Sequence, residues 1–204
     1  MRLGEFIEMA AYLVALVNPA SKIFLLSTMK PAYTWRTLRP VAIKSTVAAF
    51  VILCVLTVIG NVVLDKVFNV ELFSLNVAGG VILFLVGLNA VQHGRFYDAR
   101  LYHRTRDISI VPLAAPLIAG PGTITATLSY AAHRGVLMTI AALSCALLVN
   151  LVCMLAAVGI GRALNRVNAT GPLVRITGLI VCAVAVQMIF NGMGEWLSHV
   201  LVAR

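Results

Sequence analysis

Six long apolar stretches follow one another along the chain, separated by short polar segments. They cover residues 6–29, 41–64, 72–92, 109–130, 136–160 and 174–197. A helix needs about 20 mostly apolar residues to cross a bilayer, and each stretch is that long. Short segments of alternating apolar and polar residues, which are typical of a membrane β-barrel, do not occur. The pattern predicts an all-α membrane protein with six transmembrane helices.

Two of these stretches are interrupted by residues that break helices. The interrupting residues are Asn18, Pro19, Ala20 and Ser21 in the first stretch, and Gly120, Pro121, Gly122 and Thr123 in the fourth. Proline has no backbone donor and its ring clashes with the preceding turn. We therefore expect helices 1 and 4 to be broken near the middle of the membrane.

The interruptions belong to a longer internal repeat. A spacing of 102 residues aligns Pro19 with Pro121, and a spacing of 98 aligns Asn89 with Gln187. This predicts a single membrane domain over 1–204, made of repeat 1 (about 1–94), a basic linker (95–107) and repeat 2 (108–204). Since each repeat has three helices, the second must enter the membrane upside down, which gives two inverted three-helix repeats.

The composition agrees with a membrane protein that has little soluble mass. Of the 204 residues, 61% are hydrophobic and 11% are charged, and the mean hydropathy is +0.98. A soluble domain carries about 25% charged residues. The chain has too little polar surface to cover a globule in water.

The basic residues predict the topology. Eleven of the sixteen Lys and Arg residues lie in or beside the first, third and fifth loops: Lys30, Arg36, Arg39, Lys44, Arg95, Arg100, Arg104, Arg106, Arg162, Arg166 and Arg175. Short cytoplasmic loops are rich in Lys and Arg. We therefore expect both termini outside the cytoplasm. This distribution accounts for the net charge of +9, so membrane lipid is an expected partner and nucleic acid is not.

The interruptions are the best candidates for a binding site. A restarted helix presents free amides that favour an anion such as a carboxylate. Lys22, in the first turn after Pro19, is the one charge well inside a predicted span. A charge at that depth indicates function, and it could pair with a substrate carboxylate. The alternative is that Lys22 snorkels toward the cytoplasmic interface.

Asn89 and Gln187 are equivalent under the repeat and lie late in helices 3 and 6. As a pair they are candidates to line the same cavity. The alternative is ordinary hydrogen bonding between helices, which is common and modest in energy.

The sequence contains no pattern that indicates catalysis or a cofactor. The acidic residues all lie near span ends or in loops, the four histidines are dispersed, and the four cysteines have no zinc-site spacing. We expect no enzyme, no metal and no cofactor. Coupling to sodium or protons stays open, and backbone carbonyls at the breaks are better sodium ligands than any carboxylate inside a span.

Three motifs resemble the MarC family over essentially the whole chain. They are Asn18-Pro19, the segment Pro-Leu-x-x-Pro-x-x-x-Gly-Pro-Gly that ends at Gly122, and Ala-Val-Gln followed by Asn-Gly around Gln187. The resemblance implies a multi-pass bacterial inner-membrane protein, related to transporters of small neutral amino acids. Lys22 departs from the family pattern, and an extra cation favours a more acidic or differently placed substrate group.

Two function classes compete, and a third is weaker. The first is a secondary transporter of small solutes, with small neutral amino acids as the expected class, that rocks one repeat against the other. The second is a passive channel, since Asn18-Pro19-Ala20 matches the aquaporin signature, although the second copy reads Gly-Pro-Gly. The third is a membrane scaffold without cargo.

Overall fold

A computed structural model describes residues 3–28, 34–63, 66, 69–96, 118–166 and 170–202, and every regular element in these ranges is helical. The helices are α1 (Leu3–Val17), α2 (Pro19–Thr28), α3 (Trp35–Val63), α4 (Leu72–His93), α5 (Pro121–Arg134), α6 (Val136–Arg166) and α7 (Thr170–Val202). The linker prediction (95–107) and the first half of the fourth predicted span (109–117) fall almost wholly outside the described residues.

Five segments of the described chain are long and apolar enough to cross a membrane. They are Leu3–Leu26, Trp35–Gly60, Leu72–His93, Val136–Gly161 and Thr170–Leu201. Each overlaps one of the predicted stretches, and α5 covers the second half of the remaining one. The prediction of an all-helical multi-pass membrane protein is confirmed.

α3 and α7 begin earlier than the sequence pattern predicted, each a few residues before a proline. α3 begins at Trp35 and contains Pro40, and α7 begins at Thr170, before Pro172. Pro172 is the third residue of α7, and since first-turn amides have no intrahelical partner, proline loses little there. Pro40 is the sixth residue of α3, where its missing amide leaves the Arg36 carbonyl without the usual intrahelical donor. At the start of α3 the Thr34 amide donates to the Thr37 hydroxyl at 3.0 Å, which secures the first turn.

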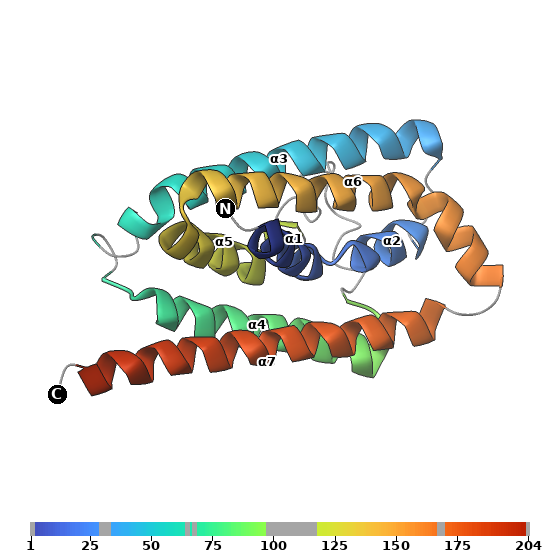
Figure 1. Cartoon of the computed structure of the whole chain (residues 1–204). Coiled ribbons are helices and arrows are strands. Elements are labelled where there is room, and N and C mark those ends of the chain that lie inside the picture. The colour runs from blue at the N-terminus through green and yellow to red at the C-terminus, as the bar shows by residue number, and fades with distance from the viewer. Residues whose placement is uncertain are drawn as a thin grey trace.

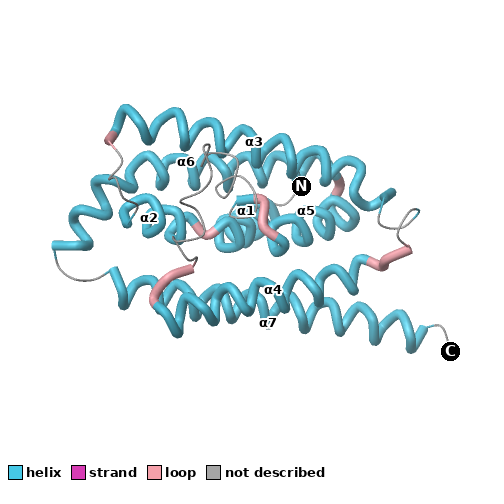
Figure 2. The backbone as a smooth tube through the Cα atoms, turned by 180° about the vertical axis from the view of Figure 1, so that it is seen from behind, coloured by secondary structure: helices cyan, strands magenta, loops and turns pink. Residues whose placement is uncertain are grey.

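The helices form three layers (Figure 1, Figure 2). α3 and α6 make one outer layer, α4 and α7 the other, and the short helices α1, α2 and α5 lie between them. The outer helices expose apolar side chains, among them Val51 on α3, Val152 on α6 and Leu179 on α7. Such faces suit contact with lipid tails rather than water.

Glycines let α4 and α7 pack closely. A Cβ added at Gly80 would lie 2.8 Å from the carbonyl oxygen of Ala185, and one added at Gly178 would lie 2.9 Å from that of Gly87. Small residues at such crossings allow the backbones of membrane helices to touch. The layer α4–α7 is therefore a tightly joined pair that borders the central short helices.

Candidate functional site

The first interruption is a single residue between α1 and α2. Asn18 has a φ of +51°, in the left-handed region that Asn tolerates better than most residues. Its amide still donates to the carbonyl of Val14 at 2.9 Å, but Pro19 has no amide hydrogen and cannot continue α1. The chain therefore turns at Asn18 and starts α2.

Asn18 also caps the helix that follows. Its Oδ1 accepts a hydrogen bond from the Ser21 amide at 3.3 Å, which is the usual bond of an N-cap residue. The Ser21 hydroxyl donates to the Asn18 carbonyl at 2.7 Å. The start of α2 is thus satisfied by its own chain, and its amides are less free than the sequence pattern predicted.

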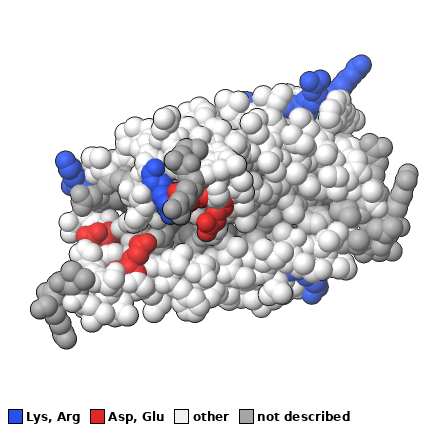
Figure 3. Space-filling view, viewed as in Figure 1, with Lys and Arg blue, Asp and Glu red and all other residues white. Residues whose placement is uncertain are grey.

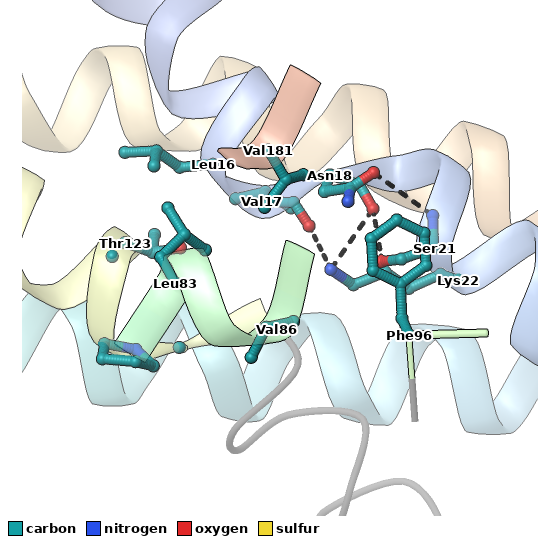
Figure 4. Close-up of a pocket in the computed structure, with 13 residues that line it drawn as sticks. Leu16, Val17, Asn18, Ser21, Lys22, Leu83, Val86, Phe96, Thr123 and Val181 are labelled. Atoms are coloured by element: carbon teal, nitrogen blue, oxygen red, sulfur yellow. Dashed lines mark hydrogen bonds between the residues drawn. The ribbon is translucent and has the colours of Figure 1, made fainter. Parts of the chain in front are cut away.

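Lys22 is buried at this interruption, with 1% of its surface exposed. Its ammonium donates to the carbonyl oxygen of Val17 and lies 3.4 Å from that of Asn18 (Figure 4). These carbonyls close the C-terminal end of α1, where a cation is electrostatically favoured. The snorkelling alternative is wrong, because the side chain runs back to the break instead of toward an interface.

The second interruption presents an open helix start. α5 begins at Pro121, and the N-cap residue Gly120 has no side chain that could bond the amides of Gly122 and Thr123. Thr123 is 2% exposed, and its hydroxyl makes no hydrogen bond within the described part of the chain. The next threonine along the chain, Thr125, instead donates back to the carbonyl of Pro121 at 2.7 Å. This end of α5 offers an anion its amides and one hydroxyl.

Both interruptions line one cavity of about 40 Å³, room for about three water molecules. Its walls are Asn18, Ser21, Lys22, Gly120, Pro121, Gly122 and Thr123 from the breaks, and Leu16, Val17, Leu83, Val86, Phe96 and Val181 around them (Figure 4). We call this space the break cavity. Segments about 100 residues apart in sequence thus meet here.

Four of the predicted site residues do not line the break cavity. Pro19 starts α2, and Ala20 packs against the apolar cluster that contains Phe24 and Phe96. Asn89 donates from its amide to the carbonyls of Arg95 and Phe96, at 3.1 and 3.3 Å. Gln187 is exposed and donates to Asn191 Oδ1 at 2.8 Å. The prediction that this amide pair shares the cavity of the breaks is therefore not met.

Gln187 borders a second, larger space of about 370 Å³, which we call the outer hollow. Its walls are Glu8, Tyr12, Asn76, Ala126, Ser129, Tyr130, Gln187, Met188, Asn191 and Glu195. The rings of Tyr12 and Tyr130 meet edge to face with centroids 6.0 Å apart, which ties α1 to α5. Apart from Gln187, these residues were not predicted as site residues. Glu8, Tyr12 and Leu16 are spaced four residues apart along α1 and so share one face of the helix. This spacing could have indicated that Glu8 and Tyr12 line a polar space.

A model of the MarC family of integral membrane proteins matches residues 3–197 of the chain. The chain belongs to the MarC family. Among the described residues of this MarC protein, no group of three or more His, Cys, Asp or Glu side chains converges to hold a metal ion. No solved structure matches the chain.

Several curated MarC relatives cover nearly the whole chain. The UPF0056 membrane protein PH0214 of Pyrococcus horikoshii is 30% identical over 192 residues, which span 94% of this chain and 95% of that protein. A UPF0056 membrane protein of Aquifex aeolicus is 30% identical over 203 residues, with 95% and 94% covered. UPF0056 membrane protein MJ1677 of Methanocaldococcus jannaschii is also 30% identical over 203 residues, with 94% and 97% covered.

Proposed function

We propose that this MarC protein is a secondary transporter of small solutes, with small neutral amino acids as the expected class. The observation that carries the proposal is the break cavity, where two helix interruptions meet. Broken helices at equivalent places in two membrane halves are a recurrent architecture of substrate sites in transporters. We place the protein in the bacterial inner membrane, with the breaks at mid-membrane.

The two halves are proposed to be inverted repeats that rock against each other. Helix bounds support this: α2 and α5 both start at the repeated proline, and α3 (Trp35–Val63) matches α6 (Val136–Arg166) at a shift of about 100. Contacts between α4 and α7 also support the inverted repeat. The Cys182 thiol lies 3.7 Å from the carbonyl of Phe84, and these residues are 98 apart, the spacing that aligns α4 with α7. Equivalent residues touch where a two-fold axis passes between them.

The glycine contacts follow the same symmetry. The pair Gly80–Ala185 becomes Gly178–Gly87 when 98 is added to one number and subtracted from the other. A Cβ added at the glycine would lie 2.8 Å from the partner's carbonyl oxygen in the first pair and 2.9 Å in the second. A pseudo-two-fold axis in the membrane plane produces such reciprocal contacts. In this proposal the ends of α4 and α7 near Arg95 and Arg175 face the cytoplasm, and both termini lie outside.

A carboxylate is the substrate group that the break cavity suits best. On one side lies the ammonium of Lys22, and on the other the amides of Gly122 and Thr123 with the Thr123 hydroxyl. The volume of about 40 Å³ is well below the roughly 300–1,000 Å³ of ligand pockets. The cavity must therefore widen to take an amino acid, which fits a carrier that changes conformation better than an open channel.

Counterflow in proteoliposomes tests the proposal. Vesicles loaded with one unlabelled amino acid should accumulate the same labelled amino acid, and the rate should saturate with concentration. Thr123→Val should weaken apparent affinity, because it removes the hydroxyl from the cavity. Thr127→Val is the matched control, since the Thr127 hydroxyl already donates to the carbonyl of Ile124 at 2.9 Å. Flux that rises linearly without saturation would favour the channel, and no flux for any amino acid would reject this cargo.

A further inference from the structure

The outer hollow continues the break cavity along the same helix faces. On α1, Tyr12 lines the hollow and Leu16, four residues on, lines the cavity. On α5, Ala126 lines the hollow and Thr123, three residues back, lines the cavity. Residues three or four apart lie on one face of a helix, so each wall of the hollow runs into a wall of the cavity.

On the two remaining helices, α4 and α7, the residue that lines the hollow and the residue that lines the cavity are equally far apart. On α4, Asn76 and Leu83 are seven residues apart, and on α7, Met188 and Val181 are also seven apart. At 1.5 Å per residue, these offsets place the hollow about 5–11 Å from the cavity along the helix axes. Four helices from both halves of the chain therefore enclose two spaces in line.

One apolar layer separates these spaces. A Cβ added at Gly122 would lie 3.0 Å from Leu83 Cδ2 and 3.3 Å from Leu16 Cδ2. The two leucines thus close over the first turn of α5. At the far side of the cavity, Phe96 is 6% exposed, and its carbonyl accepts the hydrogen bond from Asn89. Leu16 and Leu83 therefore border the cavity on one side and Phe96 borders it on the other (Figure 4).

The hollow itself is polar and acidic. Glu8 and Glu195 line it, and Figure 3 shows acidic side chains gathered around a hollow on this face. Asn76 is 6% exposed, lines the hollow, and makes no side-chain hydrogen bond within the described residues. The nearby Arg134 is paired with Glu5 at 3.2 Å, so its charge is already offset. The Asn76 amide faces this hollow beside two carboxylates, an arrangement that suits a ligand that donates hydrogen bonds.

We propose that the outer hollow is the entrance and first binding site for the substrate, where Glu8 and Glu195 hold its amine and Asn76 accepts a further hydrogen bond. Leu16 and Leu83, which both approach Gly122, form the closed gate between this entrance and the break cavity. The proposal rests on the proposed transport function for its substrate, a small molecule with a protonated amine. The volume of about 370 Å³ lies in the range of small-molecule sites.

The test uses the full-length protein without its native cysteines and with one cysteine introduced at Gln187. Membrane-impermeant thiol reagents of opposite charge are applied from each side. We expect Gln187→Cys to react roughly tenfold faster with the cationic reagent than with the anionic one. Adding Glu8→Gln and Glu195→Gln should remove that preference. Thr37→Cys, exposed at the opposite end of the molecule, should keep its own ratio when the two glutamates are changed.

A second labelling experiment tests the gate formed by Leu16 and Leu83. Thr123→Cys should be protected from the cationic reagent while Leu83 is present, and Leu83→Ala should expose it from the side that labels Gln187→Cys. Labelling at Gln187→Cys in the same Leu83→Ala protein checks that it is folded. Equal rates for both reagents, or access to Thr123→Cys only from the opposite side, would overturn the proposal. Because labelling needs no cargo, a protein that labels as expected but transports no amino acid would reject the cargo and keep the entrance.

Discussion

Replacing Lys22 with methionine asks whether its buried ammonium binds substrate or serves only the end of α1. Methionine has a similar length and no charge, and the site is 1% exposed, so the apolar chain can stay buried. The substitution removes the donor to the carbonyl of Val17 and the cation that faces the break cavity. These two losses have separate readouts.

The first loss concerns stability. A buried carbonyl left without its donor costs about 1–3 kcal/mol, so Lys22→Met should lower the free energy of unfolding by that amount in either case. The second concerns affinity. A hydrogen bond between an ammonium and a carboxylate contributes about 1.5–3 kcal/mol, which corresponds to a loss of roughly 10- to 150-fold in substrate affinity.

Counterflow gives the half-saturation concentration, and thermal unfolding in detergent gives the stability. Lys44→Met makes the same chemical change at an exposed position and should alter substrate affinity little. Lys22→Arg should also impair transport, because a flat, wide guanidinium does not replace a compact ammonium in a space of about 40 Å³. Unchanged affinity in Lys22→Met, with lower stability, would refute a role in substrate binding and leave anion recognition to the amides of α5.

Four further outcomes are expected. Gly80→Ala should destabilise the protein by about 1–3 kcal/mol in thermal unfolding, whereas Gly159→Ala, with no atom within 4 Å of the new Cβ, should be neutral or stabilising. Asn18→Ala should unfold more easily than Asn18→Gly by about 1–2 kcal/mol, because both lose the side-chain cap but only alanine resists the positive φ. Gly120→Asn should keep stability but weaken substrate binding in counterflow, since its side chain would cap the amides of α5. A phosphatase fused to the C-terminus should be active in cells and a fluorescent protein dark; the reverse would overturn the topology.

The helices could be predicted because long apolar runs have one stable solution in a bilayer, where every backbone group must bond within its own segment. The bounds were less certain at prolines. The predicted spans begin at residues 41 and 174, shortly after Pro40 and Pro172, whereas α3 and α7 begin at Trp35 and Thr170. Sequence alone shows a proline but not its distance from a start that capping residues such as Thr34 determine.

The site could be predicted only in part. Proline and glycine identified both interruptions, because few other residues break an apolar helix. The direction of Lys22 was not predictable, since it depends on where the turn at Asn18 places the carbonyls of Val17 and Asn18. Tyr12 and Asn76 were not predicted as site residues for another reason. Helices that are apolar on most faces give little indication of which face meets a polar space, and only the packing of α1, α4, α5 and α7 defines it.

The two interruptions occupy equivalent places but differ in chemistry, and this difference bears on function. The first is closed by its own chain, since Asn18 caps α2 and Lys22 bonds the end of α1. The second is open, because Gly120 contributes no side chain to the start of α5. Two identical ends would give a dipolar substrate no preferred direction in the cavity. In the proposed transporter, one cationic side chain at a carbonyl end, facing one uncapped amide end, would instead fix where a carboxylate sits. With the amine held by Glu8 and Glu195 as proposed, the break cavity and the outer hollow would orient the substrate in the same sense.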